Sequence, residues 1–292
     1  MLAAITCFFN PAGYENIKKN YFTFRNNLKG VKLFTIELSF NGEFVIDDAI
    51  HVHGNEKNIL WQKERLLNLV IEELPAKYDK VAWVDADLIF EQRWAKKASK
   101  MLDEKPVIQL FETVRDTDSD GKQFVQYPST LAVLRDGVDP VDEGIAKPGY
   151  AWACRRELIA ASGLYDGHIT GGGDLMMLYA WLGMWNGYLT TKTNVEWRRE
   201  FLKWGVPQYR KVKSNVGCLD VSIKHMFHGT RENRLYNERN YFLMDHGYDP
   251  DVDVRIGKNG LFEWCSDKPE MHKAVADYFK MRKEDEIISD RS

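Results

Sequence analysis

The spacing of apolar and polar residues predicts a chain of alternating strands and helices. Residues 2–9 and 31–39 are short apolar runs of the kind that forms buried strands. The polar and helix-breaking residues between them lead into a predicted helix over 15–27. From Asn58 to Leu74 apolar residues recur at helical spacing, and Pro75 ends that helix. Strands and helices in alternation are typical of a sheet covered by helices.

Shorter elements continue the alternation after residue 75. The pattern predicts strands at 80–90, 106–113 and 149–154, and helices at 94–102, 155–162 and 270–282. It also predicts a hairpin at Asn41-Gly42 and a solvated turn at 116–121. An irregular segment that covers a site is predicted at 127–148, and a loop-rich region at 247–264. Residues 283–292 are predicted to form a frayed, charged tail. The uncharged stretch 175–191 is shorter than the roughly 20 apolar residues of a membrane span, so it predicts a buried helix and turn.

Two acidic residues interrupt the apolar strand predicted at 80–90. Val81 and Val84 precede Asp85 and Asp87, and apolar residues resume after them. A charge at the end of a buried strand is costly unless a partner compensates it. In open α/β sheets, ligands bind at the carboxyl ends of the strands. The pair therefore predicts a site for a divalent cation and a nucleotide sugar, with a solvated turn as the alternative.

Composition excludes few classes of protein. The 292-residue chain is 44% hydrophobic and 28% charged with a formal net charge of −3, so its overall charge indicates neither a nucleic-acid nor a membrane partner. The four cysteines are far apart and form no paired motif, which predicts reduced thiols rather than a disulfide frame or a zinc knuckle. Residues 1–9 lack a basic segment before their apolar run, so they predict a first strand in a cytoplasmic protein rather than a signal peptide.

A family resemblance is carried by Trp61-Gln62-Lys63-Glu64-Arg65-Leu66-Leu67-Asn68, followed by Tyr78-Asp79-Lys80 and then by Val84-Asp85-Ala86-Asp87-Leu88-Ile89. With these segments the chain resembles the GT-A glycosyltransferases, and most of all the β1,4-galactosyltransferase branch. The resemblance implies an α/β GT-A fold, in which a Rossmann-like, mixed, mostly parallel sheet is flanked by helices. It implies a single catalytic domain over 1–265, with a nucleotide-binding half (1–90) and an acceptor half (91–265), followed by a C-terminal helix and charged tail (266–292).

The resemblance also implies roles for the residues of these segments. Asp87 would bind Mn²⁺ or Mg²⁺, Asp85 would lie by the ribose or the metal, and Lys63 would meet the nucleotide of a UDP-sugar donor. The turn with Asn10 and Tyr14, which follows the first predicted strand, is placed to hold that nucleotide. The alternative for Lys63 is a lysine that faces solvent.

A second matching segment is Thr170-Gly171-Gly172-Gly173-Asp174-Leu175. Glycines such as Gly172 and Gly173 let the backbone approach a ligand closely. In the galactosyltransferase-like families the corresponding Gly-Gly-Glu-Asp segment contacts sugar and acceptor and supplies the catalytic base, which implies that Asp174 is the base. Leu175 stands where the family has its second acid, and an Asp174 that only caps a helix is the alternative.

The third segment is His225-Met226-Phe227-His228-Gly229-Thr230-Arg231-Glu232-Asn233-Arg234. In metal-dependent GT-A enzymes a histidine late in the chain completes the coordination of the ion, which implies His228 as a metal ligand, with His225 as its competitor. Arg231 and Arg234 would neutralise a diphosphate. A histidine that merely satisfies its own hydrogen bonds is the alternative.

Together the segments predict a hexosyltransferase that moves a sugar from a nucleoside-diphosphate sugar to an acceptor hydroxyl, with inversion if Asp174 is the base and with retention if no base stands there. Residues 192–213 hold seven basic and two acidic residues with four aromatic residues between them, a composition that suits a nucleic acid. DNA with a flipped hydroxymethylated base is therefore one predicted acceptor. If 192–213 is instead an amphipathic helix packed on the core, a glycan or a lipid-linked saccharide is the alternative acceptor. A non-catalytic nucleotide-sugar-binding protein also stays open.

Overall fold

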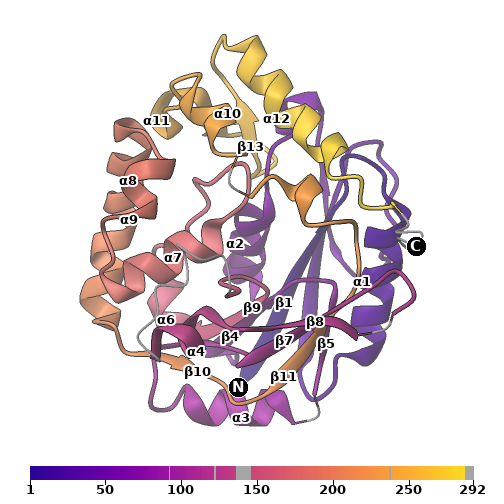
Figure 1. Ribbon diagram of the computed structural model, residues 1–292, viewed down its shortest axis with the longest axis vertical. Helices are drawn as coiled ribbons and strands as arrows, with labels where there is room; N and C mark the ends of the chain where they lie inside the picture. The colour runs from indigo at the N-terminus through magenta and orange to yellow at the C-terminus, as the bar shows by residue number, and fades with distance from the viewer. Residues whose placement is uncertain (92, 122, 136–145, 237, 287–292) are drawn as a thin grey trace.

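A seven-stranded sheet with the strand order β10-β6-β9-β4-β1-β2-β3 forms the centre of the computed structural model (Figure 1). The structure describes residues 1–286 except 92, 122, 136–145 and 237. Six strands run in one direction, namely β1 (Leu2–Phe9), β2 (Lys32–Ser39), β3 (Ile50–His53), β4 (Lys80–Val84), β6 (Val107–Gln109) and β10 (Val216–Cys218). Strand β9 (Ala151–Arg155) lies antiparallel between β4 and β6. This is the mixed, mostly parallel sheet that the sequence predicts.

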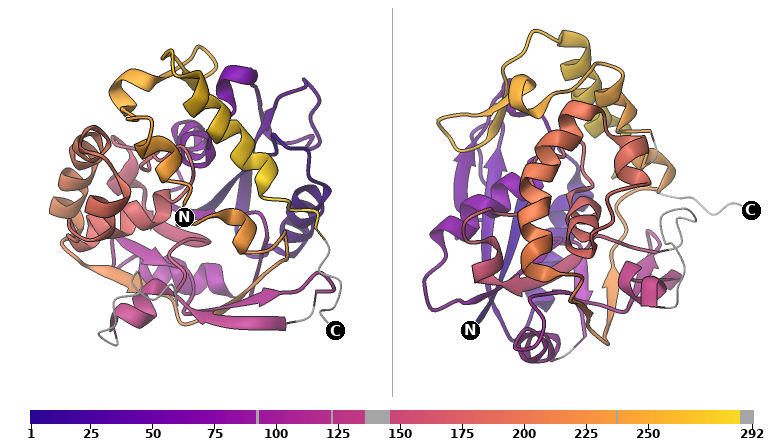
Figure 2. Two further views of the ribbon diagram at one scale, coloured as in Figure 1. Left: turned by 45° about the horizontal axis from the view of Figure 1, so that its top comes forward. Right: turned by 90° about the vertical axis from the view of Figure 1, so that its left-hand side faces the viewer.

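One face of the sheet is covered by helices from both halves of the chain. They are α2 (Lys63–Glu73), α6 (Arg156–Ile159), α7 (Gly173–Leu182), α8 (Tyr188–Lys192) and α9 (Val195–Val212). Leu67 of α2 and Trp181 of α7 belong to the same buried cluster as Trp83 of the sheet, so these helices are joined to the sheet by apolar packing. Figure 2 (right) shows the long α9 along this side of the molecule. The predicted buried helix and turn at 175–191 correspond to α7 and α8.

The other face carries two helices and a second, four-stranded sheet. The helices are α1 (Glu15–Asn27) and α3 (Trp94–Met101), and the second sheet has the order β5 (Leu88–Phe90), β11 (Ser222–His225), β7 (Thr113–Thr117) and β8 (Gln123–Pro128), with α4 (Thr130–Arg135) following it. Phe24, Trp94 and Ile223 are buried together with Ala82 of the central sheet. The layers therefore follow the predicted arrangement of a sheet between helices.

The C-terminal part of the chain lies across one end of the molecule (Figure 1). It contains the short turn η2 (Glu232–Arg234), the helices α10 (Tyr241–Met244), α11 (Pro250–Asp253) and α12 (Pro269–Met281), and the antiparallel pair β12 (Val254–Ile256) and β13 (Phe262–Trp264). The turn η1 (Glu56–Asn58), from the N-terminal half of the chain, contacts β13. Met271 and Phe279 of α12 pack with Leu60 and Ile169. The region predicted as loop-rich, 247–264, therefore holds a helical turn and a short hairpin.

The prediction of a frayed tail is wrong for residues 283–286. The Asp285 carboxylate accepts hydrogen bonds from the backbone N–H groups of Glu15 and Asn16, at 2.9 and 2.8 Å. These groups lie at the start of α1, where an anion is favoured by the unpaired N–H groups and the helix dipole. The rest of the predicted tail, 287–292, and residues 136–145 of the predicted irregular segment lie outside the described residues.

The predicted strand at 80–90 is two strands in two different sheets. Strand β4 ends at Val84 and β5 begins at Leu88. The backbone N–H of Asp85 donates to the Tyr150 carbonyl at 2.8 Å, and the Asp87 carbonyl accepts from Met226 N–H at 2.8 Å. Because the two acids bond to different neighbours, the chain leaves one sheet and enters the other between them. The predicted strand at 106–113 divides in the same way into β6 and β7.

The predicted hairpin at Asn41-Gly42 is wrong, because β2 and β3 run parallel. The cause is Glu37, a side chain of β2 that is 2% exposed. Its carboxylate accepts hydrogen bonds from the backbone N–H groups of Val45 and Ile46, at 2.8 and 2.9 Å. These bonds hold the connection 40–49 against β2, so that the chain re-enters the sheet in the parallel direction.

Among the described residues, none of the helices combines the length and the apolar character that crossing a bilayer requires. The predicted division of the chain into 1–90, 91–265 and 266–292 stays a prediction.

We expect Glu37→Ala to lower the free energy of unfolding by about 1–3 kcal/mol, because it leaves buried N–H donors without an acceptor. Urea unfolding followed by circular dichroism measures this. Glu43→Ala, an exposed glutamate in the same connection, is the matched control and should change stability by less than about 0.5 kcal/mol. Equal effects of the two substitutions would contradict the role of Glu37.

Candidate functional site

The candidate residues gather where β4 ends. Asp85 directly follows β4, and the hydroxyl of Thr6 in β1 donates to the Val84 carbonyl at 2.8 Å. Tyr150, whose carbonyl accepts from Asp85 N–H, directly precedes the antiparallel strand β9 at the same edge. The site therefore lies at the carboxyl ends of parallel strands, the usual place for ligands in such sheets.

Lys63 joins two of the predicted acids. Its Nζ lies 2.6 Å from Asp85 Oδ1 and 2.8 Å from Asp174 Oδ2. The other oxygen of Asp174 accepts a longer hydrogen bond from the Trp83 indole, at 3.3 Å. Burial would lower the pKa of Lys63, but Asp174 and Asp85 raise it well above its ordinary value. Lys63 is 8% exposed and its partners are carboxylates, so the solvent-facing alternative is wrong, while its contact with a nucleotide stays a prediction.

The same cluster contains a glutamate that sequence reasoning missed. Glu64 is 3% exposed, and a Cβ atom at Gly173 would lie 2.7 Å from its Oε1. Burial raises the pKa of Glu64 to about 8 and that of Asp85 to about 6. The cluster can thus hold a proton at neutral pH on Glu64 while the Lys63 ammonium pairs with both aspartates. Its only sequence signal was its place beside Lys63.

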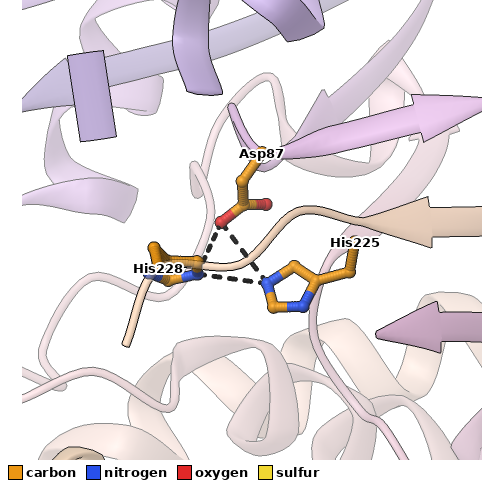
Figure 3. Close-up of side chains that lie close together, drawn as sticks. All are labelled: Asp87, His225 and His228. Atoms are coloured by element: carbon orange, nitrogen blue, oxygen red, sulfur yellow. Dashed lines mark hydrogen bonds and ion pairs between the residues drawn. The ribbon is translucent and has the colours of Figure 1, made fainter. Parts of the chain in front are cut away.

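Asp87, His225 and His228 form a separate group (Figure 3). Asp87 Oδ2 lies 2.9 Å from His228 Nε2 and 3.6 Å from His225 Nε2, and the two Nε2 atoms are 3.1 Å apart. Ligand atoms that share an ion at about 2.1 Å lie about 3.0–3.4 Å apart. Asp87 Oδ1 is buried without a hydrogen-bond partner among the described residues. These three side chains therefore fit a metal ion, whereas Asp85 lies with Lys63.

Each histidine is oriented by a second carboxylate. His225 Nδ1 lies 3.1 Å from Asp116 Oδ1, and His228 Nδ1 lies 3.2 Å from Glu284 Oε1. A hydrogen bond from Nδ1–H to a carboxylate leaves Nε2 to a metal, and it is the usual support of a metal-binding histidine. Both Nε2 atoms therefore face Asp87 in the tautomer that coordination requires.

Sequence reasoning placed both supporting acids elsewhere. Asp116 was expected in a solvated turn, but it lies in β7, where it is paired in register with His225 of the parallel neighbour β11. Glu284 was expected in the frayed tail, but it is 2% exposed. Burial would raise its pKa, but its neighbours Arg282 and His228 lower it to about 2. Neither residue has a local sequence signal, because only the sheet pairing and the docked C-terminal segment bring them to the histidines.

The pKa values of His225 and Asp87 are set by the charges of the side chains around them. Burial would lower the pKa of His225, but the charge of Asp87 and the hydrogen bonds with Asp116 and Asp87 raise it to about 9. Burial would raise the pKa of Asp87, yet His225 and His228 bring it well below its ordinary value. At neutral pH His225 therefore carries a positive charge between Asp87 and Asp116. A cation that binds its Nε2 atom must displace the proton there.

The structure places the two predicted arginines in different surroundings. Arg234 is buried, and its Nη2 donates to His228 Nε2 at 2.8 Å, so it lies directly beside the metal-binding candidates. Arg231 is exposed, with its guanidinium 5.0 Å from the centre of the Tyr127 ring. A cation on His228 Nε2 would release Arg234 from that atom and leave its guanidinium free to meet an anion.

Asn10 and Tyr14 line a small cleft that the C-terminal segment closes. The cleft has a volume of about 70 Å³, and its lining includes Trp61, Phe279 and Arg282. The Tyr14 hydroxyl donates to the Phe279 carbonyl at 2.9 Å and accepts from Lys283 N–H at 3.0 Å. Ligand pockets usually have about 300–1,000 Å³. A nucleotide can therefore bind at these two residues only when the C-terminal segment moves.

The basic stretch 192–213 offers no stacking surface for bases. It forms mainly α9, in which Trp197 and Phe201 are fully buried and the Trp204 indole donates to the Gly163 carbonyl. The basic side chains include Lys203, which pairs with Asp251 at 2.7 Å. The aromatic residues belong to the core, so the alternative of an amphipathic, core-packed helix is the correct one.

No protein-family model and no curated protein sequence matches the chain. Solved structures with a similar fold include S. aureus TarS 1–349, at 10% identity and a TM-score of 0.42 over 82% of this chain, which spans 62% of that one. The same TarS fragment in complex with UDP-GlcNAc gives 8% identity and a TM-score of 0.43 over 96% of this chain and 72% of that one. Glucosyl-3-phosphoglycerate synthase from Mycobacterium tuberculosis, in complex with Mn²⁺, UDP and phosphoglyceric acid, gives 13% identity and a TM-score of 0.37 over 87% and 81%. Likenesses this distant do not carry an argument about activity.

We expect Mn²⁺ to bind the protein with an affinity that rises with pH. Because His225 has a pKa of about 9, binding at pH 6 to 8 releases its proton, and the association constant should rise about tenfold per pH unit. Isothermal titration calorimetry in buffers of different ionisation enthalpy measures both the affinity and the proton release. Asp87→Asn should abolish binding, whereas Asp245→Asn, an exposed aspartate, should leave it unchanged. An affinity for Mn²⁺ that does not change with pH would contradict the assignment of His225 as a ligand.

Glu284→Gln should weaken Mn²⁺ binding about 10- to 100-fold while the three ligand side chains remain, because His228 loses the carboxylate that orients it. The matched control is Glu286→Gln, which changes an exposed glutamate two residues away. The same titration at pH 7.5 compares the two variants. If both bind like the unaltered protein, the C-terminal segment does not support the histidine.

Proposed function

We propose that the protein is a metal-dependent glycosyltransferase of the GT-A type, which transfers a sugar from a UDP-sugar to an acceptor hydroxyl. One observation carries the proposal. His225 and His228 each have a carboxylate on Nδ1 and direct Nε2 toward Asp87, beside the carboxyl end of β4. This is a built site for a divalent ion at the edge of the sheet where α/β proteins bind nucleotides.

The donor atoms favour Mn²⁺ over Mg²⁺. Asp87 offers oxygen, but His225 and His228 offer nitrogen, and Mg²⁺ prefers oxygen ligands and water. When bound, such an ion supplies positive charge next to the leaving diphosphate. Arg234, released from His228, would add a guanidinium on the same side, where charge develops as the sugar departs. We assign the binding of the diphosphate to Arg234 rather than to the exposed Arg231.

Asp174 is the proposed base, and its two oxygens have different roles. Oδ2 is held by Lys63 at 2.8 Å, while Oδ1 has, among the described residues, only the long bond from Trp83, at 3.3 Å. Oδ1 is therefore the oxygen that can take the proton of an acceptor hydroxyl, and Lys63 holds the carboxylate in place while it does so. A base on the acceptor side implies inversion at the anomeric carbon. Gly172 and Gly173, which precede the base, bring the backbone close to the transferred sugar.

The donor's ribose is assigned to Asp85, which follows β4 and is 26% exposed at its side chain. Asn10 and Tyr14 border the cleft proposed for the nucleotide. The acceptor is proposed to be a saccharide or another small hydroxyl compound. A DNA acceptor remains an untested prediction without the stacking surface that first favoured it, because the aromatic residues of α9 are in the core.

The purified protein should cleave a UDP-sugar in the presence of Mn²⁺ and transfer the sugar when an acceptor is supplied, as measured by UDP release over a panel of sugars. Asp174→Asn should lower kcat about 10²–10⁴-fold with little change in the KM for the donor, because it removes the base and keeps the side-chain shape.

The control for this experiment is Asp251→Asn, an aspartate paired with Lys203 at the surface, which should leave kcat unchanged. Tight binding of UDP with Mn²⁺ but no turnover of any donor would overturn the proposal in favour of a non-catalytic nucleotide-sugar-binding protein. Full activity of Asp174→Asn would instead point to a retaining mechanism that uses no base at that position.

A further inference from the structure

A polar cluster without a partner surrounds the glycine turn that leads into α7. His168 is 1% exposed, and neither of its ring nitrogens has a hydrogen-bond partner among the described residues. Arg239 is 8% exposed, and its Nε is likewise unpaired. Its guanidinium donates to the Tyr278 hydroxyl at 3.3 Å and lies over the Tyr236 ring, while no carboxylate in the described part of the chain pairs with it. Buried polar groups of this kind are costly unless a ligand satisfies them.

The histidine and the arginine face the same stretch of backbone. A Cβ atom at Gly172 would lie 3.0 Å from His168 Nε2 and 3.2 Å from Arg239 Nη2. Gly172 has φ +124°, a conformation that L side chains rarely adopt, so the turn needs glycine for its geometry as well as for space. A Cβ atom at Gly171 would lie 3.2 Å from Arg239 Nη1. The Arg239 guanidinium and the His168 imidazole therefore both lie against the glycine turn that precedes Asp174.

Three buried arginines gather at Tyr236 and Tyr278, and Arg239 is the one that lies against this turn. Arg234, Arg239 and Arg282 are 7–8% exposed, and the Tyr278 hydroxyl accepts hydrogen bonds from both Arg239 and Arg282. Glu284 pairs with Arg282, which leaves Arg239 without a compensating carboxylate in the described residues. Burial and the charge of Arg239 lower the pKa of His168 to about 3, so the imidazole is neutral and has one N–H to donate. An arginine fork beside a neutral donor suits a phosphate group.

We propose that Arg239 and His168 bind a phosphate group carried by the acceptor, so that the substrate that receives the sugar is a phosphate ester. The assignment to the acceptor rests on the proposed function, because the turn leads to the proposed base, Asp174. We assign the donor's diphosphate to a different arginine, Arg234, because its Nη2 lies 2.8 Å from Nε2 of the metal-ligand candidate His228. Both arginines also contact Tyr236, so the two proposed anion sites are neighbours that use different guanidinium groups.

The test is calorimetric titration with glycerol 3-phosphate, inorganic phosphate and glycerol, with and without saturating UDP and Mn²⁺. The protein should bind both phosphates and not glycerol, and UDP should not displace glycerol 3-phosphate. Arg239→Met should weaken the binding of glycerol 3-phosphate at least about tenfold, and Arg239→Lys should weaken it less, because an ammonium keeps the charge but not the fork. The affinity for UDP with Mn²⁺ should change less than about threefold in either variant.

The control is Arg255→Met, which changes an arginine that is 63% exposed at its side chain and lies on β12. Thermal unfolding without ligand shows whether each variant is folded, and His168→Asn gives an independent variant if Arg239→Met is not. Three outcomes would each overturn the inference. The protein binds no phosphate at all, it binds phosphate without needing Arg239 and His168, or UDP displaces glycerol 3-phosphate. If UDP fails to bind while glycerol 3-phosphate binds in an Arg239-dependent manner, the proposed donor fails and the phosphate site stands.

Discussion

The contact of Asp87 with two imidazoles is the interaction on which the candidate site depends. Asp87 stands between the two sheets, where one of its oxygens has no contact with solvent and no partner in the described residues. A carboxylate in such a place needs positive charge beside it. The protonated His225 supplies that charge, and the Nε2 atoms of His225 and His228 that face Asp87 are the ones a cation would use. The proton and the metal are therefore alternatives at one position, which couples metal binding to pH.

Four separate parts of the chain hold this arrangement in place. Asp87 comes from the link between β4 and β5, and the pairing of β5 with β11 sets His225 opposite Leu88. The parallel pairing of β11 with β7 then brings Asp116 to His225, and the docked C-terminal segment brings Glu284 to His228. That segment also passes over the Asn10 and Tyr14 cleft. Glu284, which contacts His228, and the residues that close the cleft of Asn10 and Tyr14 thus belong to one piece of backbone.

The site has two poles of opposite charge. Around Lys63 there are three carboxyl groups, and burial keeps one of them, Glu64, protonated near neutral pH. At Tyr236 and Tyr278 three buried arginines gather, and one of them, Arg239, lies against the turn at Gly171 and Gly172. The acidic pole suits hydroxyl groups and proton transfer, whereas the basic pole suits phosphate oxygens. Asp174 begins the helix between the two, which is the position from which one carboxylate can serve a substrate that spans both.

The sequence by itself determined the elements with strong local patterns and the residues that follow them. The apolar run before Asp85 and Asp87 predicted a buried strand with ligand-facing acids, and the helix at 15–27 was predicted with its observed bounds. Tertiary structure alone decided which acid serves which partner, because Lys63 reaches Asp85 across a helix–sheet contact and His225 reaches Asp87 across a strand pair. The amphipathic pattern of α9 is compatible with either a nucleic acid or a core, and only packing shows that its aromatic face is buried. Asp116 and Glu284 had no local signal at all, since strand register and chain docking, which bring distant segments together, are not encoded in any short stretch of sequence.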